Sequence, residues 1–338
     1  MDEYDDSWPW RFMGRIIDLY FLPFICLTGL ALNVACLIVF SRRHSHPLVP
    51  TLIVLSVCDS LQLLFSLFVL FLPALHDHLE MDRFGLVAQI AYIATGTLAG
   101  GLLASNCASI WTMCYVTIQR HQAIVQPLST VNTDKSLSKA VLPLIGIAIM
   151  ALLFNAPVWF QYSWSIFRVE GTSRWLLIHQ PSTLWKNDDY RFIMHKIFYP
   201  IAVYLIPLIL VSVLNMRMLS YIALRRIQSV GHSRRMARER RSTYLLISIV
   251  VLFFLCHTGG LIIRFVDHQK YENSACFIFL KDLVNVLFNV NSFANPMLYF
   301  FFTKQFKDLR THWATNWTSS AHKNLLKTMP SCKSASSL

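Results

Sequence analysis

The last apolar segment of the chain reads Asn289-Val-Asn-Ser-Phe-Ala-Asn295-Pro296-Met-Leu-Tyr299. A proline inside a helix removes one intrahelical hydrogen bond, bends the helix and frees a backbone carbonyl. Asparagine side chains can donate to such groups and accept from others. The stretch therefore predicts a kinked helix whose polar side chains meet partners on neighbouring helices.

Composition indicates where that helix lies. Apolar residues make up 55% of the 338 residues and charged residues 14%, against about 25% charged in a typical soluble domain. This excludes disorder and argues against a soluble globule. A bilayer core needs about 20 apolar residues as helix, and seven segments meet that length. They are Leu19–Ser41, His44–His76, Phe84–Gln119, Ala140–Phe167, Ile197–Met216, Ser242–Ile263 and Leu283–Thr303. We predict an all-α membrane protein with a seven-helix bundle, in which helix five begins near Tyr199, helix six near Arg241 and helix seven near Cys276.

The positive charge is unevenly distributed. The loops after segments one, three and five, with the tail from Thr303, hold 19 of the 30 basic residues and 3 of the 18 acidic ones. Because basic loops stay in the cytoplasm, the N-terminus should be extracellular. The net charge of +12 is then mostly this bias, which excludes nucleic acid as a partner. We expect no cleavable signal peptide.

Asp59 is the one acid deep in an apolar segment. An ionisable group at that depth is costly and indicates function, although a protonated carboxyl bonded to neighbouring helices would explain it equally well. Asn33 in segment one and Asn295 in segment seven could meet Asp59 at mid-depth, or serve only as interhelical hydrogen-bonding groups.

These residues carry a resemblance. Asn33, Asp59, Arg120, Pro207 and the Asn295-Pro-x-x-Tyr299 motif make the chain, from about Leu19 to Trp313, similar to rhodopsin-like G-protein-coupled receptors. The resemblance implies a plasma-membrane, multi-pass protein and no enzymatic activity. It implies a short extracellular N-terminus over 1–15, a transmembrane domain over 16–302, and an amphipathic eighth helix and cytoplasmic tail over 303–338.

The resemblance also implies a sodium pocket, a bound sodium ion being the sole cofactor expected. Its residues would be Asp59, Ser109, Asn291, Ser292 and Asn295. Hard oxygen ligands suit such a cation.

An activation switch is implied at the inner end, formed by Arg120, Glu239, His257, Pro296 and Tyr299. Gln119 stands where the family has an acid beside the arginine, so we expect Glu239 to clamp Arg120 instead. The alternative is that Arg120 only reaches the membrane surface. His257 replaces the family's tryptophan and is either a rotamer switch or a hydrogen-bonded core histidine.

The family's outer disulfide is missing. Its partners would stand at Thr95 and in the loop 161–196, which contains no cysteine. We expect packing to hold this loop, and extracellular reductant to leave function intact.

The ligand is less well determined. Leu102 stands where amine receptors have an acid, and Asn289 where opsins have a lysine. The loop 161–196 contains three tryptophans, which suits peptide capture or an interfacial belt. Span six (Leu-Cys-His257-Thr) and span five (Tyr199-Pro to Pro207) resemble invertebrate FMRFamide-like receptors, implying a short, amidated, cationic peptide. A lipid or small neutral ligand is the alternative. The expected pocket comprises Asn106, His257, Arg264, Lys281, Asp282 and Asn285.

The inner partner implied is a heterotrimeric G protein, with arrestin as a further partner. The basic run 225–241 borders the expected cleft or binds anionic lipid. A transporter is the remote rival, but it would need related halves with broken helices, and the chain has one buried acid and no internal repeat.

Overall fold

The computed structural model describes residues 8–41, 48–82, 84–125, 137–168, 175–228, 233–266, 271 and 274–302. The chain divides into two units, Met1–Pro296 and Met297–Leu338. The helical bundle belongs to the first unit. Of the second unit, the structure describes 297–302, the last residues of helix α13. The predicted eighth helix and Cys332 lie outside the described residues.

Seven helical segments are long and apolar enough to cross a membrane, which confirms the predicted fold class. Their elements are α1 (Trp8–Ile16), η1 (Ile17–Phe21) and α2 (Leu22–Ser41); α3 (Val49–Ser66), η2 (Leu67–Phe71) and α4 (Leu72–His78); α5 (Leu86–Val125); α7 (Leu137–Asn155) and η3 (Ala156–Gln161); α9 (Asp188–Arg191), η4 (Phe192–Phe198), η5 (Pro200–Leu205) and α10 (Ile206–Gln228); α11 (Ser233–Phe265); and α13 (Ala275–Phe302).

Two predicted helix starts and one predicted end were wrong. Helix five begins at Asp188 rather than near Tyr199, and helix six at Ser233 rather than near Arg241. Charged residues end membrane burial but not helix formation, because arginine and glutamate are good helix formers in water. Segment four leaves its helical path after Gln161, before Phe167. The start of helix seven at Ala275 confirms the prediction near Cys276.

Four short π-helical turns lie in three spans, and each turn ends two residues before a proline. The turn η1 precedes Pro23, η2 precedes Pro73, η4 precedes Pro200 and η5 precedes Pro207. A proline cannot donate to the carbonyl one turn earlier, and a wider turn redistributes the freed bonds. Each of these prolines is thus preceded by a wider helical turn in span one, two or five.

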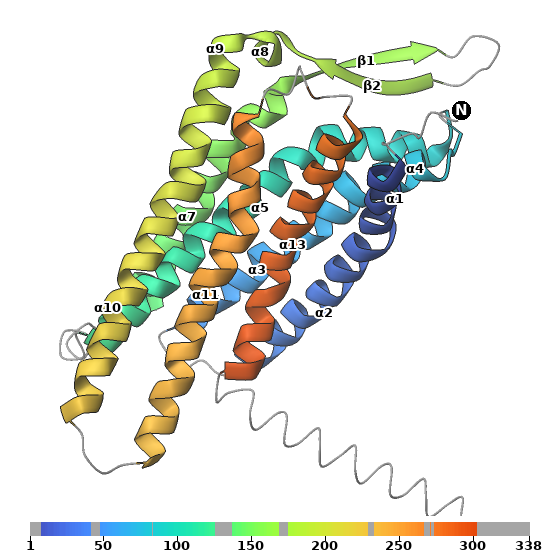
Figure 1. Cartoon of the computed structure of the whole chain (residues 1–338). Helices are drawn as coiled ribbons and strands as arrows, with labels where there is room; N and C mark the ends of the chain where they lie inside the picture. The colour runs from blue at the N-terminus through green and yellow to red at the C-terminus, as the bar shows by residue number, and fades with distance from the viewer. Residues whose placement is uncertain are drawn as a thin grey trace, which may run out of the picture. The chain divides into compact units, whose positions relative to one another are not determined.

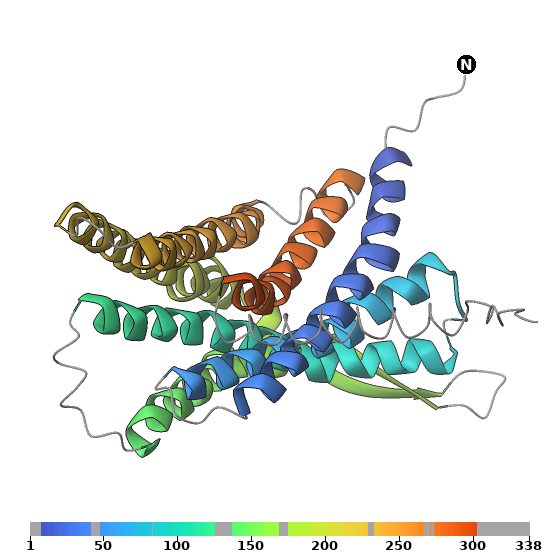
Figure 2. The same ribbon diagram turned by 90° about the horizontal axis from the view of Figure 1, so that it is seen from below.

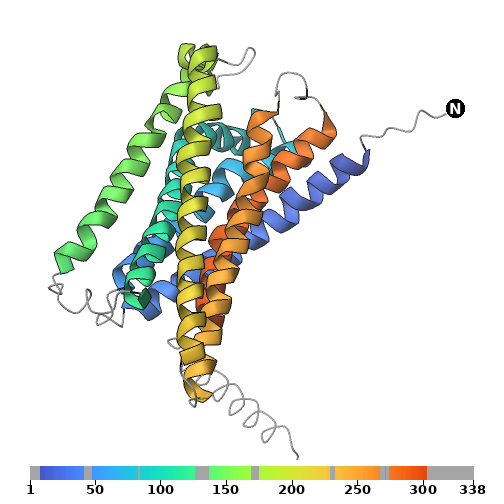
Figure 3. The same ribbon diagram turned by 60° about the vertical axis from the view of Figure 1, so that its left-hand side comes forward.

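Helix α5 runs through the middle of the bundle. It packs against α3, α7 and α10. Seen from below, α10 and α11 lie on one side of it and α3 and α7 on the other (Figure 2). At one end lie the start of α1, the short helices α8 (Thr183–Lys186) and α9, and a β-hairpin (Figure 1). At the other end, α10 and α11 extend side by side (Figure 3).

The loop between spans four and five forms the antiparallel hairpin β1 (Tyr162–Arg168) and β2 (Trp175–Pro181). It is attached to α5 without a covalent link. The Gln89 side chain exchanges hydrogen bonds with the backbone of Leu177, at 3.0 and 3.5 Å. The Trp164 ring covers Gly96 so closely that an added Cβ would lie 2.5 Å from it. All seven cysteines that the structure describes are free.

Candidate functional site

The bundle contains a buried polar centre around Asp59, whose side chain has no solvent exposure. The hydroxyl of Ser109 on α5 donates to Asp59 Oδ1 at 2.5 Å, and Asn295 Nδ2 on α13 donates to Oδ2 at 2.9 Å. Helices α3, α5 and α13 thus meet at one carboxyl group. The predicted convergence of Asp59 with segment seven is what the structure shows.

A second layer of bonds surrounds this carboxyl. Asn33 Nδ2 on α2 donates to the backbone carbonyl of Ser292, at 3.2 Å, and so brings span one to the kinked helix. The Ser292 hydroxyl donates to Gln62 Oε1 at 2.9 Å. The same hydroxyl group lies within hydrogen-bonding range of Asp59. Gln62 Nε2 donates to the carbonyl of Phe288 at 3.0 Å. Sequence reasoning missed Gln62, although it lies three residues after Asp59 and one helical turn away.

The polar centre fits a small hard cation. Asp59 supplies a carboxylate, and Ser109 and Ser292 supply hydroxyl oxygens beside it. Asn291 is fully buried, and neither atom of its side-chain amide has a hydrogen-bond partner in the described part of the chain. Such an unmatched carbonyl oxygen is costly unless something binds it. These are oxygen ligands of the kind sodium takes, whereas the described residues form no cluster of three His, Cys, Asp or Glu suited to another metal.

The inner end of α5 carries Arg120 and Gln119. Gln119 Oε1 accepts a hydrogen bond from Thr51 on α3, at 2.9 Å. It therefore ties α5 to α3 in the place where an acid would pair with the arginine. Glu239 lies within α11, but its side chain and that of Tyr299 are outside the described part of the structure. The clamp between Arg120 and Glu239 stays a prediction, and Pro296 lies inside α13 as expected.

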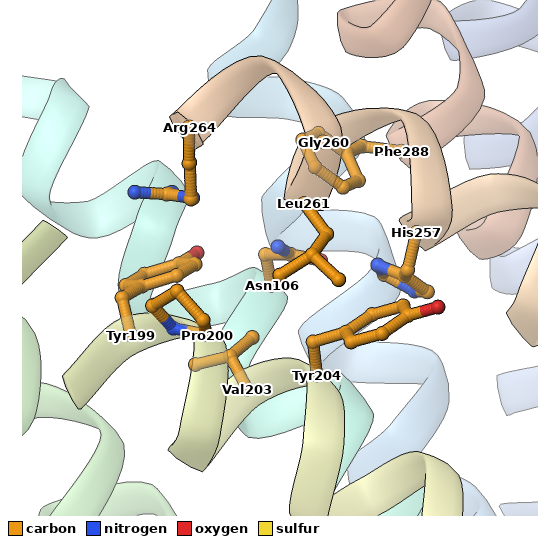
Figure 4. Close-up of a pocket in the computed structure, with 10 residues that line it drawn as sticks. All are labelled: Asn106, Tyr199, Pro200, Val203, Tyr204, His257, Gly260, Leu261, Arg264 and Phe288. Atoms are coloured by element: carbon orange, nitrogen blue, oxygen red, sulfur yellow. The ribbon is translucent and has the colours of Figure 1, made fainter. Parts of the chain in front are cut away.

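A narrow cavity of about 20 Å³ opens between α5, span five, α11 and α13 (Figure 4). Three predicted ligand residues line it: Asn106, His257 and Arg264. Three aromatic residues that sequence reasoning missed complete it: Tyr199, Tyr204 and Phe288. The Tyr199-Pro200 pair was the available signal, since a proline inside span five alters the helix at the tyrosine that lines the cavity.

The other three predicted ligand residues lie outside this cavity. Lys281 Nζ lies 5.5 Å from the centre of the Phe277 ring. Asp282 faces α1, where its Oδ2 would be 3.8 Å from a Cβ added to Gly14. The backbone carbonyl of Asn285 accepts a hydrogen bond from the Asn289 side chain, with 2.8 Å between Nδ2 and oxygen. The structure therefore divides the predicted set into a group on α5 and α11 that lines the cavity and a group on α13 that does not.

His257 connects the cavity with the core. Its ring is 4.5 Å from that of Phe253 and 5.4 Å from that of Phe288. It is 4% exposed, and its Nε2 has no hydrogen-bond partner among the described residues. The ring is held by packing, which suits a side chain that changes rotamer better than a fully hydrogen-bonded core histidine.

The hairpin places further aromatic groups at the outer end. The His179 ring lies 4.7 Å from Tyr162, 5.6 Å from Trp164 and 5.6 Å from Tyr92 of α5. Burial lowers the pKa of His179 and raises the pKa of Tyr162. A larger cavity of about 420 Å³ adjoins His179, between α4 and α5.

Comparison with known proteins agrees with this architecture. The chain is 24% identical to the allatostatin-A receptor of Bombyx mori, over 88% of this chain and 79% of that protein. It is 23% identical to neuropeptide FF receptor 2 of Mus musculus, over 86% of this chain and 70% of that protein. The chain is 22% identical to the FMRFamide receptor of Drosophila melanogaster over 82% of its length. The matched part spans about half (50%) of that relative's own length.

A family model extends the agreement to most of the transmembrane region. Residues 32–299 match the model described as 7 transmembrane receptor (rhodopsin family). The match includes Asn33, Asp59, Arg120 and the Asn295-Pro296 pair, and the seven spans and the buried centre are consistent with it. The chain is a multi-pass membrane receptor, not an enzyme, and it belongs to the rhodopsin family of G-protein-coupled receptors.

Proposed function

We propose that this receptor binds a short, amidated, cationic neuropeptide of the FMRFamide-like kind and activates a heterotrimeric G protein at the plasma membrane. The names of the similar receptors support a peptide ligand. The outer end has features that suit a cationic peptide. Asp18 on η1 is paired with His78 of α4 at 3.3 Å, and Asp282 lies nearby on α13. Excess acid at this end would attract a basic ligand.

One observation carries the proposal: a series of ring contacts and hydrogen bonds connects the narrow cavity lined by Phe288 with the polar centre around Asp59. The Phe288 side chain lines the cavity and packs against the His257 ring, while its backbone carbonyl accepts from Gln62. Gln62 in turn accepts from Ser292, which lies beside Asp59. A ligand that moves Phe288 or His257 therefore acts on groups that join α3, α5 and α13.

The mechanism we propose is a population shift. A bound agonist favours a state in which the inner end of α11 moves outward. Arg120 is released from Glu239, and a cytoplasmic cleft admits the C-terminal helix of the G protein. Sodium at the Asp59 centre would favour the inactive state, because it occupies oxygens that must rearrange. Arrestin is a second partner expected for the same cleft.

The test is ligand-stimulated nucleotide exchange on purified G proteins, with the receptor in nanodiscs and a panel of amidated peptides. Each peptide is tested with its free-acid form, and with its arginine replaced by citrulline. We expect amidated, arginine-containing peptides to stimulate exchange and the citrulline forms to lose at least about tenfold in potency. Stimulation by lipids or small neutral molecules alone would instead support the alternative ligand class.

A further inference from the structure

Arg264, in the last turn of α11, is a cation at the outer end of the narrow cavity. Its guanidinium lies 3.7 Å from the centre of the Tyr199 ring, and Nη1 is 3.5 Å from His195 Nδ1. Figure 4 shows the guanidinium beside Tyr199, across the cavity from His257. The side chain also lines a second small cavity of about 20 Å³ that extends towards α7 and η4. Arg264 thus separates two spaces that a ligand could join.

This cation has no carboxylate partner in the described part of the chain. The ion pairs there are His76–Asp77, His78–Asp18 and Arg191–Asp188. The charged-group contacts of Arg264 are with Tyr199 and His195, and neither of these brings a negative charge in its ordinary neutral form. A charge that is partly removed from water and lacks a counterion is unfavourable, so the site favours an anion.

The neighbouring polar groups can complete an anion site. Asn106 is 4% exposed, and its side-chain Oδ1 has no hydrogen-bond partner among the described residues. The same holds for the His257 Nε2 atom. The other side of the Asn106 amide is within hydrogen-bonding range of the Tyr199 hydroxyl. If this amide turns over, Nδ2 points into the cavity and the tyrosine donates to Oδ1. Arg264 and Asn106 would then both donate to one acceptor group.

We propose that Arg264 and Asn106 form an anion subsite, and that the receptor's ligand places a carboxylate there. The inference goes beyond the proposed function, because it holds whether the carboxylate belongs to a peptide or to another ligand. In an amidated peptide the carboxylate would come from an aspartate or glutamate side chain. In a free peptide it would be the C-terminus. Guanidinium and carboxylate form paired, charge-assisted hydrogen bonds, which distinguish a carboxylate from a carboxamide of the same shape.

The experiment measures binding without G protein. Purified receptor in nonionic detergent at low ionic strength is titrated with N-acetyl-phenylalanine and with N-acetyl-phenylalaninamide, and the Tm is followed. N-acetyl-aspartyl-phenylalaninamide supplies a side-chain carboxylate instead of a terminal one. We expect at least one acid probe to raise the Tm by about 3 °C at 10 mM. Its apparent affinity should exceed that of the neutral amide about tenfold.

Variants locate the effect. In Arg264→Gln the acid and the amide should bind equally, and Arg264→Lys should keep a reduced preference for the acid. Two control variants should keep the full preference for the acid over the amide. Lys281→Gln removes a cation on the outer side that does not line the cavity, and Arg217→Gln removes one at the opposite end of span five. Asp267→Asn removes the nearest acid in sequence, which lies outside the described residues, and should not weaken acid binding.

Three outcomes overturn the proposal. They are equal shifts by acid and amide in the wild type, no shift by any acid probe, and a preference that persists in Arg264→Gln. The wild-type comparison is decisive even if Arg264→Gln does not fold. Failure of amidated peptides to stimulate nucleotide exchange would count against the proposed function and leave this test unaffected.

Discussion

Gln62 of α3 donates a hydrogen bond to the backbone carbonyl of Phe288 on α13, with 3.0 Å between Nε2 and oxygen, across 226 positions of sequence. The carbonyl belongs to the residue whose ring lines the ligand cavity. The same glutamine side chain accepts from Ser292 beside Asp59. One amide thereby links the ligand cavity to the polar centre, and its two bonds break together if α13 moves along α3.

Replacement of this glutamine should therefore affect signal transfer more than ligand binding. In Gln62→Leu we expect maximal agonist-stimulated nucleotide exchange to fall at least about threefold, because a buried carbonyl and a hydroxyl lose their partners. Agonist affinity should change less than about twofold. Ser60→Ala is the control, since the Ser60 hydroxyl donates within its own helix, to the Ser56 carbonyl at 2.7 Å, rather than to a neighbouring helix. Equal losses of affinity and efficacy in Gln62→Leu would show that the bond is only structural.

Sodium should compete with agonist through Asp59. Replacing choline chloride with sodium chloride should lower agonist affinity about tenfold in the wild type. Asp59→Asn keeps the shape and can still accept from Asn295 while its amide nitrogen donates to Ser109, but it removes the charge that a cation needs. Its agonist affinity should be the same in both salts, and Asp77→Asn, at an exposed carboxylate, should behave as the wild type. Radioligand competition in the two salts measures this, and sodium sensitivity that survives in Asp59→Asn would exclude the site.

Much of this centre could be predicted because its chemistry is local. A lone acid and a proline-containing asparagine motif within apolar segments leave few possible partners, so Asp59 and Asn295 could be expected to meet, whereas Ser109 was placed beside them by the family resemblance. Gln62 could not, because an amide one turn from Asp59 has no sequence mark that separates it from a lipid-interface residue. The hairpin depends on tertiary packing. The π-helical turns and the helix starts at Asp188 and Ser233 follow from prolines and helix propensity, which the length of an apolar segment does not record. The ligand set divided because α13 turns Lys281 and Asp282 away from the cavity.

Removal of the predicted clamp should raise basal signalling. In Glu239→Ala we expect exchange without agonist to rise about fivefold, because an Arg–carboxylate pair that stabilises the inactive state would be lost. Glu239→Gln should give a smaller rise, since it keeps a hydrogen bond. Asp189→Ala removes an acid at the outer end and should leave basal exchange unchanged. Basal activity at the wild-type level in Glu239→Ala, at equal receptor expression, would mean that Arg120 is held by other groups.

The contact between Gly96 and Trp164 should hold the hairpin in place of a disulfide. A Cβ at Gly96 would lie 2.5 Å from the tryptophan ring, whereas one at Gly146 of α7 meets no atom within 4 Å. Alanine for glycine inside a helix is otherwise favourable by about 1 kcal/mol. Gly146→Ala should therefore raise the Tm slightly. Gly96→Ala should lower the Tm, because overpacking reduces the free energy of unfolding by about 1–3 kcal/mol. The difference between the two variants isolates the clash.

Agonist binding should follow the same order, with Gly96→Ala losing about tenfold in affinity and Gly146→Ala losing none. Extracellular reductant should leave the wild type unchanged, because the described cysteines are free. An effect of reductant as large as that of Gly96→Ala would mean a disulfide between two receptor molecules, because Cys332 is the single cysteine outside the described residues.

The hairpin should loosen as the pH falls. Burial lowers the pKa of His179 in the folded protein below its value of about 6.5 in an unfolded chain. Above pH 6.5 the histidine is neutral in both states and contributes no pH dependence. As the pH falls through 6.5 the open hairpin gains a proton that the closed one resists, so the closed form loses stability.

Hydrogen exchange of the β1 and β2 amides at pH 7.5 and 5.5 tests this. After correction for intrinsic exchange rates, protection should fall at the lower pH. His179→Gln should lose much of this dependence, because glutamine does not titrate. The groups that face His179 are Tyr92, Tyr162 and Trp164, with His76 and Asp77 across the adjoining cavity. The comparison should therefore be repeated in His76→Gln and Asp77→Asn. If the pH dependence of protection disappears in the His76 or Asp77 variant but persists in His179→Gln, the titrating group belongs to the His76–Asp77 pair of α4 instead.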